Sequence, residues 1–312
     1  MSRSRRSDVA FVLSGGASLG AVQAGMLRAL YEHGIAPDLI VGTSAGALNG
    51  AFIAARPPTV ETTGELSKIW TSLTRGQVFP VNPLTGLLGF LGARDHLVPQ
   101  SGLRQLIARH VGARTLEELA VPLHVVTADV LTGEEVRLSR GPLIDAVLAS
   151  TAIPGVLPPV AWDGRVLMDG GVANNTPISH AIDLGAQRIY VLPVGHACTL
   201  RQAPGSALSM ALHAISLLTQ QRLIGDVERH RGDAQLIVLP PPCPLDVQPN
   251  DFAHAAELIA RAYRDARAFL RAGGEDRPPL RMRMHRHAPA RTGRGAQVRT
   301  ERREKPRDHA RR

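Results

Sequence analysis

Short apolar runs alternate with longer segments in which apolar residues recur at intervals of three and four. The first pattern is typical of buried parallel strands, and the second indicates helices with one face on a core. The pattern predicts strands at 9–13, 39–42, 122–130, 134–139, 165–168, 188–194 and 235–240. It predicts helices at 20–33, 45–55, 64–73, 102–110, 143–149, 206–230 and 251–271.

The order of these elements indicates the fold class. A strand, a helix, a strand and a helix follow one another within the first 55 residues, which favours parallel strands joined by helical crossovers. The short turn between 122–130 and 134–139 predicts one antiparallel hairpin. We therefore expect a three-layer α/β/α domain with a mainly parallel central sheet over residues 8–280. The Pro278-Pro279 pair marks its end.

The net charge of +9 is confined to the C-terminal tail. Residues 281–312 hold 12 Lys and Arg and 3 Asp and Glu, a difference of +9, so the first 280 residues hold 24 of each sign. A neutral domain argues against nucleic acid as its partner. The Arg-rich tail is expected to be disordered and dispensable for chemistry, with binding to an anionic membrane or nucleic acid as the alternative. His285 and His287 lie in this tail, and we do not expect them to bind a metal.

Targeting and redox features are few. Two cysteines, Cys198 and Cys243, are too few for a disulfide framework or a Cys-rich zinc site. No apolar run reaches the roughly 18 residues of a transmembrane helix. The apolar stretch near the N-terminus is broken at Gly15, too early for a signal peptide. We expect a cytoplasmic protein, peripheral at the membrane at most, that needs no metal or other cofactor.

The sharpest chemical signal is the pentapeptide GTSAG at residues 42–46, between a predicted strand and a predicted helix. It fits G-x-S-x-G, in which a serine on a strained strand-to-helix turn exposes its hydroxyl above the sheet. Side chains at Gly42 or Gly46 would collide with the neighbouring strand and helix. The N-terminus of the helix favours negative charge beside Ser44. Ser44 is thus a candidate nucleophile; the alternative is an ordinary connection built of small residues.

A second turn, SGGASLG at residues 14–20, also joins a strand to a helix. Its spacing does not fit the dinucleotide fingerprint, and it lacks the ending of a phosphate loop. The N–H groups of Gly15, Gly16 and Ala17 are instead suited to bind an anion at the start of a helix. Beside a nucleophilic serine they would form an oxyanion hole. A tight turn without a ligand is the alternative.

A third motif, DGG, begins at Asp169, where a predicted strand ends. Gly170 and Gly171 would let the backbone pass close to a neighbouring loop. By itself this pattern is typical of a β-turn in which the aspartate caps the following backbone.

Together the three motifs resemble the patatin-like phospholipases, and the segment 149–160 is similar to the stretch before the aspartate in that family. The resemblance covers about residues 8–195. It implies a serine lipid acyl hydrolase that cleaves a lipid or phospholipid ester through an acyl-enzyme. Ser44 would be the nucleophile, Asp169 its base in a dyad without histidine, and residues 15–17 the oxyanion hole. Ala17 departs from the family's third glycine, and Leu19 replaces its usual basic residue.

Three other functions remain open at this point. One is a Ser-His-Asp α/β-hydrolase, with a base among the histidines that follow Asp169: His180, His196, His213, His230 and His254. That fold usually places its serine after several strands, whereas Ser44 follows the second. Another is a non-catalytic module that binds lipid or protein, although such a module would not need both Ser44 and Asp169. The third is acyl transfer to an alcohol by the same residues. The apolar segment Leu84–Leu91 is expected to be core, or else a lid or membrane-facing surface.

Overall fold

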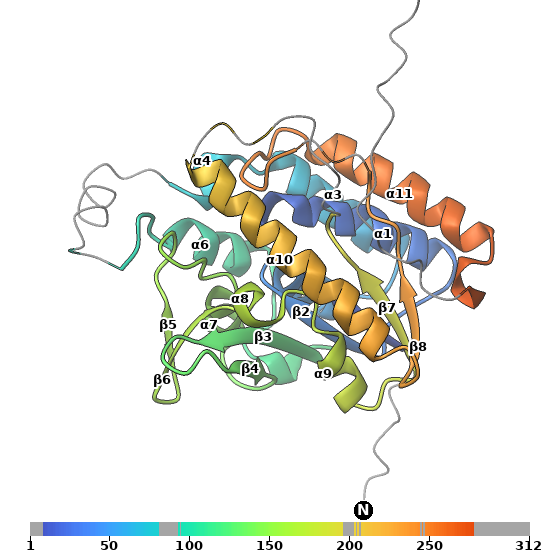
Figure 1. The fold of residues 1–312 in the computed structure, drawn as a ribbon, viewed down its shortest axis with the longest axis horizontal. Helices are drawn as coiled ribbons and strands as arrows, with labels where there is room; N and C mark the ends of the chain where they lie inside the picture. The colour runs from blue at the N-terminus through green and yellow to red at the C-terminus, as the bar shows by residue number, and fades with distance from the viewer. Residues whose placement is uncertain are drawn as a thin grey trace, which may run out of the picture.

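A mixed sheet of eight strands runs through the centre of the molecule (Figure 1). The computed structural model describes residues 9–80, 93, 95–195, 203, 205, 207–243, 245 and 247–277. The strands are β1 (Val9–Leu13), β2 (Leu39–Thr43), β3 (Leu123–Asp129), β4 (Glu135–Leu138), β5 (Val160–Trp162), β6 (Arg165–Asp169), β7 (Arg188–Leu192) and β8 (Gln235–Val238).

Five of the strands form a parallel core in the order β3-β2-β1-β7-β8. The other three are antiparallel additions: β4 and β6 both pair with β3, and β5 pairs with β6. The expected mainly parallel sheet and the β3–β4 hairpin are confirmed. Strand β5 was not predicted, because its three residues are too short to give a pattern of their own.

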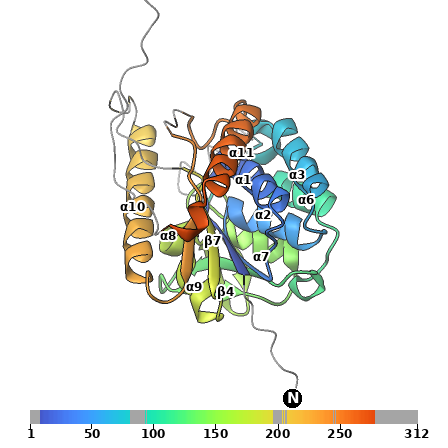
Figure 2. The ribbon, with the colours of Figure 1, turned by 90° about the vertical axis from the view of Figure 1, so that its right-hand side faces the viewer.

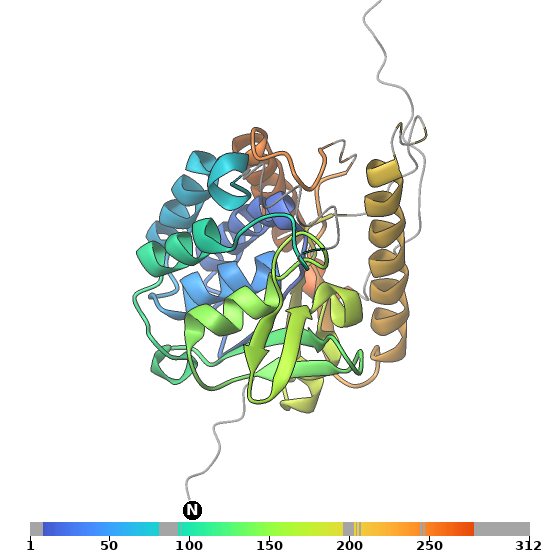
Figure 3. The same ribbon diagram turned by 90° about the vertical axis from the view of Figure 1, so that its left-hand side faces the viewer.

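Helices cover both faces of the sheet, which confirms the three-layer architecture (Figures 2 and 3). One face carries α1 (Ala21–Glu32), α2 (Ala45–Ala54), α3 (Val60–Ser72), α6 (Ser101–His110), α7 (Leu143–Ser150) and α11 (Ala255–Arg271). The opposite face carries α9 (Ile178–Asp183) and α10 (Ala207–Arg229). Shorter helices lie in the connections: η1 (Ala17–Gly20), α4 (Arg75–Val78), η2 (Leu116–Glu118), α8 (Gly171–Asn174) and η3 (Gly274–Asp276).

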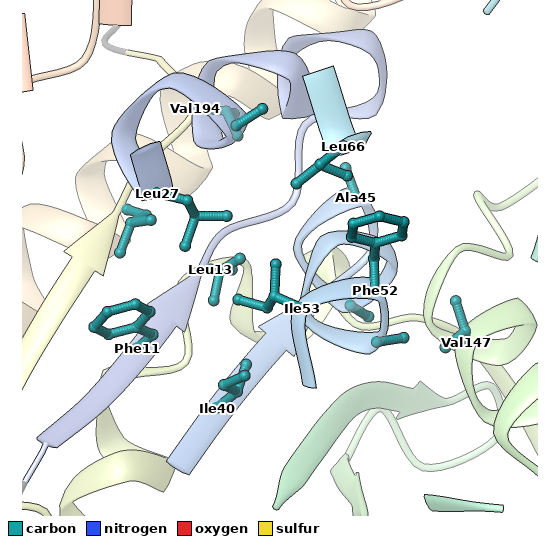
Figure 4. Close-up of a cluster of buried hydrophobic side chains, with 14 of the residues drawn as sticks. Phe11, Leu13, Leu27, Ile40, Ala45, Phe52, Ile53, Leu66, Val147 and Val194 are labelled. Carbon is teal, nitrogen blue, oxygen red and sulfur yellow. The ribbon is translucent and has the colours of Figure 1, made fainter. Parts of the chain in front are cut away.

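The alternation of side chains along the strands divides the core in two. Phe11 and Leu13 of β1 point towards α1 and α2, where Figure 4 shows them among Ile40, Ile53 and other buried side chains. Their neighbours Ala10 and Val12 belong to the second cluster, which packs against α9 and α10. Because both faces of the sheet are buried, its central strands are continuously apolar, as the sequence indicated.

Some helix boundaries differ from those predicted. Helix α3 begins at Val60, four residues earlier than expected, because the Thr59 side chain accepts a hydrogen bond from the Thr62 N–H and caps the helix. Helix α11 begins at Ala255, four residues later than predicted. The predicted helix 20–33 is preceded by the short helix η1, which turns the chain after the glycine-rich loop.

Several predictions concern residues outside the described part of the chain. They include the tail, the segment 84–91, His196, His285 and His287. The domain limits 8–280 stay a prediction. Within the described residues, none of the helices combines the length and apolar character needed to cross a bilayer. Cys243 is disulfide-bonded, which the low cysteine count did not lead us to expect.

Candidate active site

Ser44 lies on a strained turn between β2 and α2. Its backbone has φ 53° and ψ −121°. Residues other than glycine rarely adopt a positive φ of this kind. A Cβ atom on Gly46 would lie 2.1 Å from the carbonyl oxygen of Leu13, and one on Gly42 would lie 2.6 Å from that of Gly46. Both glycines are therefore required sterically, since the turn is pressed against β1 on one side and its own helix on the other.

The register of β3 explains why Asp169 reaches this turn. Val126 of β3 pairs with Thr43 of β2, and the next residue, Thr127, pairs with Asp169 of β6. Strand β4 pairs with both Val126 and Thr127, so it occupies one edge of β3 and leaves the other edge to β2 and β6. These two strands run towards each other along that edge. The residue after β2 thus meets the last residue of β6.

The two side chains are joined directly. Ser44 Oγ donates a hydrogen bond to Asp169 Oδ2 at 2.7 Å, and the Gly171 N–H donates to Asp169 Oδ1 at 2.7 Å. Both residues are only 6 % exposed. Burial raises the pKa of Asp169 from 3.8 to about 6, against the lowering effect of these two hydrogen bonds. The carboxylate is consequently a stronger proton acceptor than an exposed aspartate.

The glycines after Asp169 allow close passage of the chain. A Cβ atom on Gly170 would lie 2.3 Å from the carbonyl oxygen of Val126, and one on Gly171 would lie 2.9 Å from Asn175 Oδ1. No group of residues suited to hold a metal ion occurs in the described part of the chain.

Ser150, at the end of α7, was missed as a site residue. It is fully buried, its Oγ accepts a hydrogen bond from the Ser44 N–H at 2.8 Å, and it donates to the Val126 carbonyl at 2.6 Å. It ties the strained turn to β3. The one signal in the sequence was its position in the segment 149–160, which drew attention through family resemblance without pointing to this residue.

The glycine-rich loop lies beside the turn but differs in detail from the prediction. The Gly15 N–H donates to the Asn175 carbonyl at 3.0 Å, so it is not free to bind an oxyanion, and that part of the prediction is wrong. Its importance is spatial, since a Cβ atom on Gly15 would lie 3.0 Å from Ser44 Cβ. The N–H groups of Gly16 and Ala17 have no acceptor among the described residues. Ala17 has φ 49°, a strained conformation that a glycine would adopt freely.

An apolar pocket opens next to Ser44. Its empty space, including the mouth, is about 810 Å³. Ala17 and Ser44 line one part of it, and the remaining walls are mainly side chains of α2, α3 and α6. Figure 4 shows Phe52 of α2 and Leu66 of α3 in the core, and both are among these wall residues. A pocket with such walls suits a hydrocarbon chain.

The described histidines among the triad candidates lie elsewhere. Those that are described make no hydrogen bond to Ser44 or Asp169: His180, His213, His230 and His254. Three of them have an acidic neighbour instead: Glu135 for His180 at 3.0 Å, Asp233 for His230 at 2.7 Å and Asp251 for His254 at 3.4 Å.

Comparison with known proteins agrees with the resemblance in the sequence. Residues 11–182, more than half of the chain, match the patatin-like phospholipase family. Patatin-like phospholipase domain-containing protein 7 of Mus musculus is 34 % identical over 194 residues, which cover 60 % of this chain and 14 % of that protein. An uncharacterized NTE family protein of Mycobacterium bovis is 35 % identical over 175 residues, covering 55 % of this chain and 44 % of its own. The chain thus spans less than half the length of these relatives.

Among solved structures, VipD from Legionella pneumophila has 14 % sequence identity to this protein and a TM-score of 0.45. The alignment covers 86 % of this chain and 67 % of the VipD chain. The type III effector protein ExoU aligns with 86 % of this chain and 53 % of its own, at 17 % identity and a TM-score of 0.36. By the match over residues 11–182, the chain belongs to the patatin-like phospholipase family.

Proposed function

We propose that this protein is a serine hydrolase of lipid esters, with Ser44 as nucleophile and Asp169 as its general base. The observation that carries the proposal is the 2.7 Å hydrogen bond from Ser44 Oγ to Asp169 Oδ2 at the mouth of an apolar pocket. A serine hydroxyl is a weak nucleophile and needs a base within hydrogen-bond reach. Burial raises the pKa of Asp169 to about 6, closer to neutral pH, which makes it a better proton acceptor than an exposed aspartate.

The reaction proceeds in two steps. Ser44 Oγ attacks the acyl carbonyl carbon and gives its proton to Asp169, which passes the proton to the departing alkoxide as the ester bond breaks. Water then attacks the acyl-enzyme and gives a proton to Asp169. The proton returns to Ser44 Oγ as the fatty acid leaves, so the enzyme is regenerated.

The negative charge on the carbonyl oxygen needs donors that are already in place. We assign this role to the N–H groups of Gly16 and Ala17, which have no protein acceptor among the described residues and lie on a loop that ends in helix η1. The N-terminus of α2 adds a favourable dipole beside Ser44.

The acyl chain of the substrate would occupy the pocket behind Ser44. The walls include Leu48, Phe52 and Leu103 and few polar groups. Each methylene of the acyl chain that leaves water for this pocket therefore favours binding by about 0.8 kcal/mol. The headgroup would remain at the mouth. We therefore propose esters of medium or long acyl chains, including phospholipids, as the substrate class.

A Ser-His-Asp triad receives no support from the geometry. A triad places an imidazole between the serine and the carboxylate, and a direct bond of 2.7 Å leaves no space for one. Acyl transfer would use the same residues and differs only in whether water or an alcohol attacks the acyl-enzyme.

The test compares wild type with Ser44→Ala on p-nitrophenyl esters of increasing chain length and on phosphatidylcholine micelles, with release of free fatty acid as the readout. A fluorophosphonate probe should label wild type and not Ser44→Ala. Ser72→Ala, which changes an exposed serine at the end of α3, serves as the matched control and should retain both properties. Hydrolysis that persists in folded Ser44→Ala protein would falsify the nucleophile assignment.

A further inference from the structure

Three buried side chains, one each from α1, α2 and α3, form a chain of hydrogen bonds. Gln23 is fully buried, Asn49 is 1 % exposed and Trp70 is 4 % exposed. Trp70 Nε1 donates to Asn49 Oδ1 at 2.8 Å, and Asn49 Nδ2 donates to Gln23 Oε1 at 2.8 Å. Such a network inside an apolar core is costly unless every polar atom has a partner.

The direction of the network is set at Trp70. An indole N–H can only donate, so the oxygen of the Asn49 amide must face it. The Asn49 nitrogen must then face the Gln23 oxygen. The Gln23 nitrogen is left to donate outwards, to the carbonyl oxygens of Ser14 at 2.9 Å and Leu192 at 3.0 Å.

Gln23 and Asn49 also hydrogen-bond to the two ends of the glycine-rich loop, residues 14–20. Gln23 Nε2 donates to the carbonyl of Ser14, the first residue of the glycine-rich segment 14–20, at 2.9 Å. Asn49 Nδ2 donates to the carbonyl of Gly20, the last residue of that segment and of η1, at 3.0 Å. Between these points lie Gly16 and Ala17, whose N–H groups we assign to the oxyanion hole. The loop also packs on the network, since a Cβ atom on Gly20 would lie 2.8 Å from the Trp70 ring.

We propose that Gln23 and Asn49 are positioning residues for the oxyanion hole, with Trp70 setting the orientation of both amides. This inference rests on the proposed hydrolysis at Ser44. Fixing the loop at both ends keeps the Gly16 and Ala17 N–H groups in place before the transition state forms, which is the condition under which such donors are effective. Trp70 also lines the acyl pocket, so the same side chain forms a wall of the pocket and orients the network.

The test uses variants that keep the volume of each side chain. Gln23→Met removes the N–H groups that donate to the Ser14 and Leu192 carbonyls, and with them the hold on the Ser14 end of the loop. Trp70→Phe keeps a ring in the pocket while removing the N–H that orients Asn49. Thr63→Val is the matched control: Thr63 is fully buried on α3, and its hydroxyl donates to the Val60 carbonyl of its own helix. Each variant is assayed with p-nitrophenyl butyrate, and its thermal unfolding is recorded.

For Gln23→Met we expect kcat to fall about 10- to 100-fold while KM changes less than about twofold, because the loss falls on the transition state. Fluorophosphonate labelling should slow in parallel. Trp70→Phe should lower kcat about 3- to 10-fold, and the double variant should be no slower than Gln23→Met alone, since both changes act through one chain of amides. Thr63→Val should keep the wild-type kcat even where its unfolding temperature drops as much as that of Gln23→Met.

Wild-type kcat in folded Gln23→Met or Trp70→Phe would overturn the positioning role. So would a double variant whose loss is the product of the two single losses. Failure of the proposed function is distinct from these outcomes, because wild type itself would then lack Ser44-dependent turnover. Should Gln23→Met not fold, the milder Trp70→Phe decides the question.

Discussion

Ser44 Oγ and Asp169 Oδ2 are hydrogen-bonded at 2.7 Å although 125 residues separate them in the chain. The contact follows from two strands that meet end to end along one edge of β3, with Thr43 and Asp169 opposite consecutive residues. A shift of β6 by one residue would turn the Asp169 side chain to the other face of the sheet. The pairing register is thus part of the site.

The tether from Ser150 to the Ser44 turn gives a first prediction. Ser150→Ala leaves the Ser44 N–H and the Val126 carbonyl without their side-chain partner. We expect a loss of unfolding free energy of about 1–3 kcal/mol, together with a fall in kcat, because the strained turn is less well held. Chemical denaturation and ester hydrolysis measure the two effects.

The matched control for this change is Ser67→Ala, which removes a hydroxyl that bonds within α3. It should leave kcat unchanged. Equal kcat values for wild type and Ser150→Ala would show that the tether has no part in orienting Ser44.

A second prediction compares Gly46 in the turn with Gly64 in α3. Gly46→Ala would place a Cβ atom 2.1 Å from the Leu13 carbonyl oxygen, whereas nothing lies within 4 Å of a Cβ atom on Gly64 in α3. Gly46→Ala should lose activity and several kcal/mol of stability. Gly64→Ala should gain about 0.5–1 kcal/mol, because alanine favours the helix. Thermal unfolding of both variants checks this, and an active, stable Gly46→Ala protein would show that the turn is not packed as described.

A third prediction concerns the pH dependence of stability. The pKa of Asp169 is about 6 in the folded protein and 3.8 as its ordinary value, so the folded state binds more protons between these limits. The contribution of Asp169 to stability is therefore present below pH 4 and is lost as the pH rises through 6. Compared with Asp169→Asn, wild type should lose about 2 kcal/mol of unfolding free energy between pH 4 and 7. A difference between the two proteins that does not change with pH would mean an ordinary, unshifted carboxyl.

The rate of hydrolysis should depend on the same ionisation. A base must be deprotonated to act, so kcat/KM should rise with pH through a limb near pH 6, the pKa of Asp169 in the free enzyme. A histidine base could give a limb at a similar pH. Temperature separates the two, because a carboxyl pKa hardly moves on warming and an imidazole pKa falls. A limb that moves to lower pH on warming from about 15 to about 35 °C would identify a histidine.

The sequence predicted the parts of this site better than their arrangement. Each strand-to-turn-to-helix unit is local, so apolar runs and flanking glycines were enough to find the turns around Ser44 and Gly15. The meeting of β2 with β6 depends on long-range pairing to β3, for which no local pattern exists. The same holds for Gln23 and Asn49, which are ordinary polar residues on predicted helices, and for Ser150, which directly follows the predicted helix 143–149, until the fold brings them to the loop and the turn. The Gly15 N–H was misassigned because its acceptor, Asn175, lies on a distant loop.

The most direct test of the account is the kcat/KM of Asp169→Asn on a soluble p-nitrophenyl ester, measured beside His180→Gln, His213→Gln, His230→Gln and His254→Gln. An amide cannot take the serine proton, so Asp169→Asn should lose about 10³-fold or more. Each histidine variant should stay within about threefold of wild type, since none of these side chains bonds to Ser44 or Asp169 in the described structure. Asp169→Asn activity within about tenfold of wild type, or one histidine variant as inactive as Ser44→Ala, would contradict the direct Ser44–Asp169 dyad.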